Sequence, residues 1–328
     1  MKLPDLHEEF LNTLSEKYPK KSALTNIVSD VLRIEKESAY RRLSGKVSFS
    51  VREVGIIAKQ LGISLDALNT YGKDQLLLPF NLENAMQSSM DVLLHIMTET
   101  IVRLERMTCE TVVAGNVYNS IPVEFFLYSP ELSKFMLFKW GHYFVGGDEF
   151  NDYRSWKIPS DLSSIQKRTK DVYQFKNIYY IWDDGLIWTY LNEVANLYKM
   201  RIIDKQNKND IKEALKDMLT KLEQTLSGNY VNEFGIDPDI IDFYACSRSS
   251  GVSCNYYMTE NHDQFFAFLQ TNFSHCLIDN DYDNFCKMKA WVDSFKRIST
   301  MLSRSGRMER RIFFDTQLKL VDLVLNSD

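Results

Sequence analysis

The sequence has little of what a disulfide-built protein needs. Its five cysteines are odd in number and contain no C-x-x-C pair: Cys109, Cys246, Cys254, Cys276 and Cys286. An odd set without close pairs excludes a dense disulfide framework and favours reduced thiols. We therefore expect free, mostly buried cysteines in a cytoplasmic protein.

Long apolar runs are also missing. No stretch of about 18 apolar residues occurs, so no transmembrane helix is expected. The start, MKLPDLHEEF, lacks the apolar segment of a signal peptide. Hydrophobic residues make up 45% of the 328 residues and aromatic ones 13%, ample for packed cores. This length and composition predict a soluble, two-domain protein with no membrane partner.

Catalytic and metal-binding patterns are absent as well. The sequence holds no G-x-S-x-G, no Walker glycine loop and no H-E-x-x-H. The histidines are scattered, and the adjacent His275 and Cys276 would not naturally chelate one metal. Asp183 and Asp184 precede Gly185, which predicts a turn or a helix cap. We expect no metal, no cofactor and no enzymatic activity.

The two signs of charge are segregated along the chain. The net charge of −5 gives no hint of a nucleic-acid partner. Residues 17–59, however, hold ten Lys or Arg against four Asp or Glu, a net of +6, so the remainder sums to −11. A basic region in an acidic protein indicates that one part meets phosphate and the rest does not.

Short amphipathic segments fill this basic region. Apolar spacing and end signals predict helices over 5–18, from a cap at Ser22 to 32, over 36–44, from 50 to 62, and after Ser64. Gly45 suits the left-handed position after the third helix. Ser50 and Glu53 form an S-x-x-E capping box for the fourth. The prediction is a small all-helical domain over residues 1–72.

Within these helices lies a pattern with a polar break. It reads Val28-Ser29, Leu32, Ile34, Ser38-Ala39 and Leu43-x-Gly45, followed by REVGIIAKQLG and ISLDAL. This pattern resembles the helix-turn-helix domain of the Xre family, the lambda repressor and Cro-like regulators. The resemblance implies that the third helix reads double-stranded DNA in the major groove. The family usually has glycine in the turn, where this chain has Arg33.

The resemblance supplies candidate DNA-contacting residues. The outer face of the third helix predicts base contacts by Lys36, Glu37, Ser38, Tyr40 and Arg41. Helix ends and flanks predict phosphate contacts by Lys20, Lys21, Arg42, Lys46, Ser48 and Arg52. Glu35 and Glu37 repel phosphates; they either accept hydrogen bonds from cytosine N4 or indicate weak binding.

A second, larger domain is expected after a linker over 73–81. Residues 82–107 carry apolar side chains at helical spacing: Met86, Met90, Leu93, Met97, Ile101 and Leu104. The favoured interpretation is a helix that packs on its own domain, and the alternative is a dimer seam. TVVAG and VEFFLY predict strands, and Ser129-Pro130 begins a helix. Further helices are expected over 160–174, 184–200, 208–227, 282–303 and 307–326.

Three runs predict an antiparallel meander in this second domain: IIDFYACS, VSCNYYM and QFFAFLQ. The expected fold class is therefore mainly α, with a small all-α helix-turn-helix domain followed by a helix-rich α+β domain, over 82–328, with a small antiparallel sheet. Two aromatic clusters lie at 118–143 and 179–190. They are interpreted as core, with a ligand pocket as the alternative.

The sequence thus favours a one-component transcription regulator. We expect a homodimer on a pseudo-palindromic operator, with a second domain that dimerises and an unidentified small-molecule effector as a further partner. The second domain, with VEFFLYSPELSKFMLFKW and SRSGRMERRIFF, also resembles that of a group of bacterial helix-turn-helix regulators. One alternative is a helical head that docks a protein partner, supported by Glu35 and Glu37. Another is an enzyme with a DNA-tethering head.

Overall fold

The computed structural model divides the chain into two compact units. The first comprises Met1–Leu78 with Asn280–Asn284, and the second comprises Pro79–Asp279 with Phe285–Asp328. The structure describes residues 5–63, 65–68, 81–82, 101–107, 112–127, 129–158, 160, 164, 168, 177–228, 241–247, 251–271, 274–279 and 281–326. The predicted linker lies outside these residues except for Asn81, which belongs to a strand. The predicted domain limits stay predictions.

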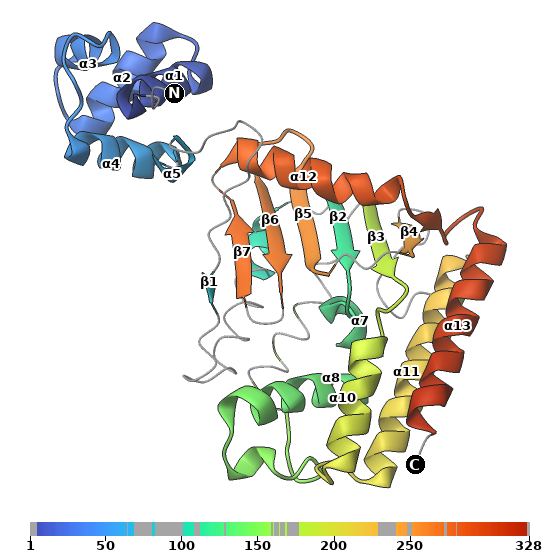
Figure 1. The fold of residues 1–328 in the computed structure, drawn as a ribbon. Helices are drawn as coiled ribbons and strands as arrows, with labels where there is room; N and C mark the ends of the chain where they lie inside the picture. The colour runs from blue at the N-terminus through green and yellow to red at the C-terminus, as the bar shows by residue number, and fades with distance from the viewer. Residues whose placement is uncertain are drawn as a thin grey trace. The chain divides into compact units, whose positions relative to one another are not determined.

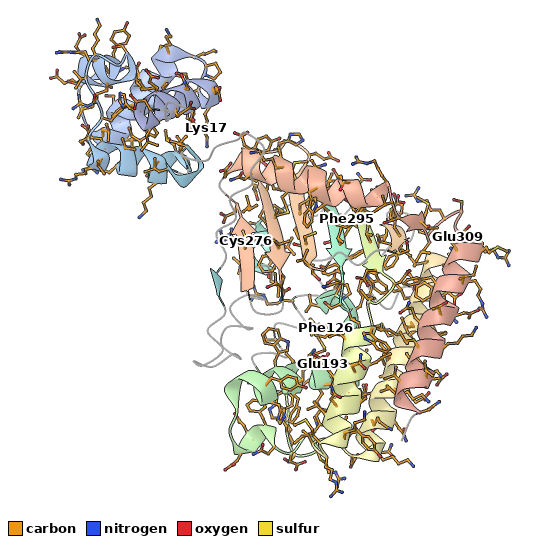
Figure 2. All side chains as sticks on the ribbon, in the orientation of Figure 1. Lys17, Phe126, Glu193, Cys276, Phe295 and Glu309 are labelled. Carbon is orange, nitrogen blue, oxygen red and sulfur yellow. The ribbon has the colours of Figure 1, made fainter. Side chains whose placement is uncertain are left out.

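The first unit is all-helical in its described residues (Figure 1). Its helices are α1 (Leu6–Lys17), α2 (Lys21–Leu32), α3 (Lys36–Leu43), α4 (Val51–Leu61) and α5 (Leu65–Leu68). They share a core of Phe10, Leu14, Leu24, Val28, Ala39, Phe49 and Ile57. Lys17, labelled in Figure 2, donates from Nζ to the Leu61 carbonyl at 2.8 Å and so ties α1 to the end of α4.

One predicted cap in this unit is wrong. Ser22 does not cap α2, because the helix begins at Lys21 with Lys20 at the cap position, whose side chain makes no capping hydrogen bond. The predicted capping box of α4 is confirmed. The Glu53 N–H donates to Ser50 Oγ at 3.3 Å, and the Ser50 N–H donates to Glu53 Oε2 at 2.8 Å.

The second unit is built on a mixed sheet, so the prediction of a small antiparallel sheet is wrong. Among the described residues the strand order is β1-β7-β6-β5-β2-β3-β4-β8. The strands are β1 (Asn81–Leu82), β2 (Val112–Tyr118), β3 (Ile178–Asp183), β4 (Ile241–Cys246), β5 (Ser253–Thr259), β6 (Phe265–Gln270), β7 (Ser274–Ile278) and β8 (Thr300–Met301). Strands β2, β3 and β4 are parallel, and the other pairs are antiparallel.

The predicted meander is correct in two of its three strands. The run IIDFYACS forms β4, which pairs with β3 and β8 rather than with β5. The meander is instead β5, β6 and β7. VEFFLY is not a strand, because Pro122 precedes a short helix, α7 (Val123–Phe126), whose last three residues are buried.

Helices complete the second unit. They are α8 (Pro130–Trp140), which continues as a π-helical turn (Gly141–Val145) before a 3-10 turn (Asp148–Phe150), then α10 (Trp188–Lys199), α11 (Lys205–Leu226), α12 (Tyr282–Lys296) and α13 (Arg307–Leu325). Figure 1 shows α10, α11 and α13 side by side. The predicted helix over 160–174 lies mostly outside the described residues.

Only the end of the predicted 82–107 helix is described. Residues 101–106 are helical, and Ile101 and Leu104 are buried in the core of the second unit. At these two positions the helix packs on its own domain. The rest of the segment lies outside the described residues, so its use as a dimer seam stays a prediction.

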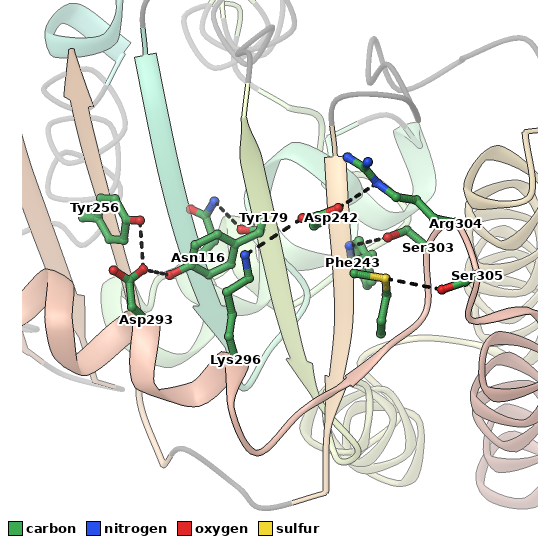
Figure 3. A network of polar contacts seen from close by, with 11 residues as sticks. Asn116, Tyr179, Asp242, Phe243, Tyr256, Asp293, Lys296, Ser303, Arg304 and Ser305 are labelled. Carbon is green, nitrogen blue, oxygen red and sulfur yellow. Dashed lines mark hydrogen bonds and ion pairs between the residues drawn. The ribbon is translucent and has the colours of Figure 1, made fainter. Parts of the chain in front are cut away.

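Helix α12 is held on one face of the sheet by a polar network (Figure 3). The Tyr179 and Tyr256 hydroxyls both donate to Asp293 Oδ1, at 2.5 Å and 3.0 Å. Both rings lie over Gly115 of β2, where a Cβ atom would collide with them. Beyond the end of α12, Arg304 Nε lies 2.9 Å from Asp242 Oδ1 of β4. The partly buried hydrogen bonds of Asp293 therefore help to position the helix.

Most of the aromatic residues noted in the sequence fill the core of this unit. Phe125, Phe135, Phe138 and Trp182 are fully buried. Tyr143 and Trp188 are exceptions, with exposures of 46% and 49%.

Glu124 of α7 is the anomaly in this core. It is 4% exposed, and neither of its carboxylate oxygens has a hydrogen-bond partner among the described residues. Burial raises the pKa of Glu124 from 4.5 to about 7, although the Tyr180 and Tyr118 hydroxyls favour its charged form.

Replacing Glu124 with Gln is expected to stabilise the second unit more at about pH 8 than at about pH 5. Because the folded state keeps a proton that the unfolded chain releases from pH 4.5 upward, wild-type stability is lost as the pH rises towards 7 and beyond. The loss is on the order of 3 kcal/mol. Denaturant unfolding at both pH values measures it. A Gln variant of exposed Glu149 serves as control, and a pH-independent gain would contradict the assignment.

Candidate nucleic-acid interface

A tight left-handed turn connects α2 and α3. Arg33 has φ 54° and ψ 46°, the left-handed region. The Ile34 N–H donates to the Ser29 carbonyl at 3.1 Å, and the Arg33 N–H donates to the Asp30 carbonyl at 3.4 Å. This pair of bonds is the Schellman arrangement that ends many helices, usually with glycine at the left-handed residue. The turn is therefore the compact one that a glycine would form, with arginine in its place.

Ser29 locks the turn from the side of α2. It is buried, and its Oγ donates to the Ile34 carbonyl at 2.6 Å. Ala39 of α3 is completely buried against the same core, and Leu43 packs at its edge. A side chain larger than serine at this crossing would push the helices apart, and an apolar one would leave the carbonyl without this donor. Ser29, Ala39 and Leu43 thus fix the orientation of α3.

The outward face of α3 carries most of the predicted base-contacting residues. Lys36, Glu37, Tyr40 and Arg41 are exposed, and Tyr40 is 51% exposed despite its large ring. They recur at helical spacing of three and four residues, so they occupy one side of the helix. Ser38 is only half-buried, at the margin of this face.

Arg42 differs from the other predicted phosphate contacts. Its Nη2 lies 3.0 Å from Glu53 Oε1, its Nη1 donates to the Ser38 carbonyl at 3.3 Å, and its side chain is 22% exposed. Burial opposes ionisation of Glu53, but the Ser50 N–H and the Arg42 guanidinium bring the pKa of Glu53 below its usual value of 4.5. Arg42 thereby joins α3 to the first turn of α4, and its phosphate contact stays a prediction.

The remaining predicted phosphate contacts are exposed at helix ends or in loops. Lys46 follows Gly45, which has φ 75°, and Ser48 and Arg52 flank the start of α4. Lys20 and Lys21 stand at the start of α2, where no side chain caps the helix. Uncapped N–H groups at a helix N-terminus favour bound anions.

Val51 is a residue that the sequence reasoning missed. It lies on the first turn of α4 and is 90% exposed, between Ser50 and Arg52. The helical periodicity identified Val54, Ile57 and Ala58 as the buried side of α4. Val51 lies three residues before Val54 and seven before Ala58, so the spacing places it near that side and gave no signal of its exposure. An exposed apolar side chain among cations suits contact with a sugar or a thymine methyl group.

Comparison with known proteins found no matching family model, no significantly similar curated protein and no significantly similar solved structure. Within the described part of the chain, no three His, Cys, Asp or Glu residues are grouped as metal ligands. Over the same residues, no helix combines the length and apolarity that crossing a membrane requires.

Replacing Arg33 with Gly is expected to stabilise the first unit by about 1 kcal/mol, because glycine adopts the left-handed conformation without steric cost. Ala23→Gly, on the exposed side of α2 and away from the turn, is the matched control and should destabilise by about 0.5–1 kcal/mol. Hydrogen–deuterium exchange of the full chain measures both effects in α2 and α3. Faster exchange in the Arg33 variant would contradict the turn geometry.

Proposed function

We propose that the chain is a sequence-specific, DNA-binding transcription regulator of the one-component type. The observation that carries this proposal is α3. Its exposed side presents Lys36, Tyr40 and Arg41 together, and the turn at Arg33 and the buried Ser29 hold it at a fixed angle to α2. A helix-turn-helix protein requires such an arrangement to place a helix in a major groove.

The surrounding cations support the same proposal. Lys20, Lys21, Lys46 and Arg52 are exposed at helix ends and in the loop beside α3. Contacts of this kind hold a protein in register on the duplex without reading its sequence. Arg41 is the best candidate for base readout, because a guanidinium can pair bidentately with guanine O6 and N7. A homodimer would place two such helices on a pseudo-palindromic operator.

A protein-docking head is the second candidate function. Glu35 and Glu37 are exposed at the start of α3, and the apolar Tyr40 and Val51 are exposed nearby in the sequence. Carboxylates at this position disfavour phosphate, while mixed apolar and charged side chains suit a protein surface. Binding measurements with DNA separate the two functions.

The first test is a selection of bound duplexes from random DNA, followed by titration of the selected duplex at several salt concentrations. The four exposed cations predict that log K falls with log salt at a slope of about −4 for each bound head. Affinity that is insensitive to salt, or no enriched sequence, would favour the protein-docking function.

The second test compares two single substitutions on the selected duplex. Arg41→Ala should cost about 1–3 kcal/mol and relax preference at one base position. Lys46→Ala should weaken binding to all sequences alike and reduce the salt slope by about one unit. Lys59→Ala, exposed on α4 but outside the proposed interface, is the control. If both variants weakened binding to all sequences equally, the assignment of Arg41 to base readout and of Lys46 to a phosphate contact would be contradicted.

A further inference from the structure

Glu124 differs from the other buried charged side chains of the described residues. Each of those has a partner. Lys139 contacts Glu193, and Asp183 accepts the Gly185 N–H at 2.6 Å. Lys208 lies 4.0 Å from the centre of the Tyr198 ring, and Arg310 donates to the Leu302 carbonyl at 2.8 Å. Neither oxygen of Glu124 makes a well-formed hydrogen bond among the described residues, and only the Tyr118 and Tyr180 side chains act on its charge. A buried polar group left unpaired opposes folding, so its presence calls for another explanation.

Asn255 extends this unpaired acceptor surface. Its Nδ2 donates to the Tyr118 hydroxyl at 3.4 Å, while its Oδ1 is buried without a partner. The same Tyr118 hydroxyl acts on Glu124, so the tyrosine connects the two residues. Three acceptor oxygens, two from Glu124 and one from Asn255, therefore lack well-formed hydrogen bonds around one tyrosine. The nearby Asn116 provides a contrast, because its amide donates to the Tyr179 carbonyl at 3.2 Å and accepts from Tyr257 at 3.3 Å.

The two tyrosines that act on the Glu124 carboxyl group, Tyr118 and Tyr180, belong to a cluster of aromatic rings. The Phe125 ring, next to Glu124 in the chain, lies 5.4 Å from Tyr180 and 5.2 Å from Trp182, centre to centre. Tyr118 stacks with Tyr180 at 6.3 Å. Ring faces attract cations, and they do so more strongly where water is excluded. A carboxylate among such rings offers opposite charge and apolar contact to the same ligand.

The place in the fold is one where open α/β sheets bind ligands. Tyr118 is the last residue of β2, and Trp182 is opposite it near the end of the parallel strand β3. Figure 1 shows α7, which carries Glu124, at the carboxyl ends of these two strands. Ligands of such sheets bind outside the carboxyl ends of the parallel strands. Asn255 is only partly buried, so the cluster reaches towards solvent.

We propose that Glu124 and Asn255, with the rings of Tyr118, Tyr180 and Trp182, bind a small organic cation carrying a primary ammonium group. An ammonium group has three N–H donors, which match the three unpaired acceptor oxygens. The carbon frame of the ligand lies against the aromatic rings. The proposal does not depend on the DNA interface, because every residue in it belongs to the second unit.

The test measures thermal unfolding of the full chain with methylammonium, butylammonium, benzylammonium and phenethylammonium ions. The neutral alcohols with the same carbon frames serve as matched ligands. At least one ammonium ion should raise the unfolding midpoint of the second unit in a concentration-dependent manner, because a ligand that binds the folded state stabilises it. Its alcohol should give no shift. Glu124→Gln should abolish the shift, and Glu149→Gln should keep it.

Calorimetric titration of the same ligand checks binding directly, without DNA, in the wild type and both variants. If Glu124→Gln fails to fold, the proposal is still tested in the wild type, by comparing the shift of the unfolding midpoint with the ammonium ion and the shift with its matched alcohol. A shift with no ammonium ion, equal shifts from ammonium ions and alcohols, or an undiminished shift in Glu124→Gln would each overturn the proposal. Glu124 would then be a buried acid with no ligand.

Discussion

The hydrogen bond from Ser29 Oγ to the Ile34 carbonyl is the contact on which the geometry of the first unit depends. It spans the left-handed turn at Arg33 and holds the end of α2 to the start of α3 at 2.6 Å. Helix α3 has eight residues, too few to be stable in isolation. Its position therefore comes from this turn and from the burial of Ala39. The outward direction of Tyr40 and Arg41 is a consequence of both.

Much of the first unit follows from local signals in the sequence. The capping box of Ser50 and Glu53, the left-handed Gly45 and the apolar spacing act within one or two helical turns, so they can be recognised without a structure. The partnership of Arg42 with Glu53 could not be recognised, because it joins two helices. The start of α2 could not be recognised either. Ser22 has a good capping side chain, but the helix begins at Lys21, so Ser22 is its second residue and Lys20 occupies the cap position.

The sheet of the second unit was harder to predict because its pairing is not local. All six residues of β3 are buried, so this strand lacks the alternation that marks a half-exposed strand. The run that forms β4 looks like its neighbours β5 and β6, yet its partners are β3 and the distant β8. Glu124 was missed for a related reason. Nothing in VEFFLY indicates that its one acid is enclosed by aromatic rings contributed by two separate strands.

The two tyrosines above Gly115 have a consequence for how this protein varies among its relatives. Both rings occupy the space that a side chain on β2 would take, and both hydroxyls reach the same carboxylate of α12. A larger residue at 115 is tolerated only if Tyr179 and Tyr256 are replaced together, which leaves Asp293 without its phenol donors. These four positions should therefore evolve as a correlated set. Their covariation would trace the docking of α12 through divergent homologues.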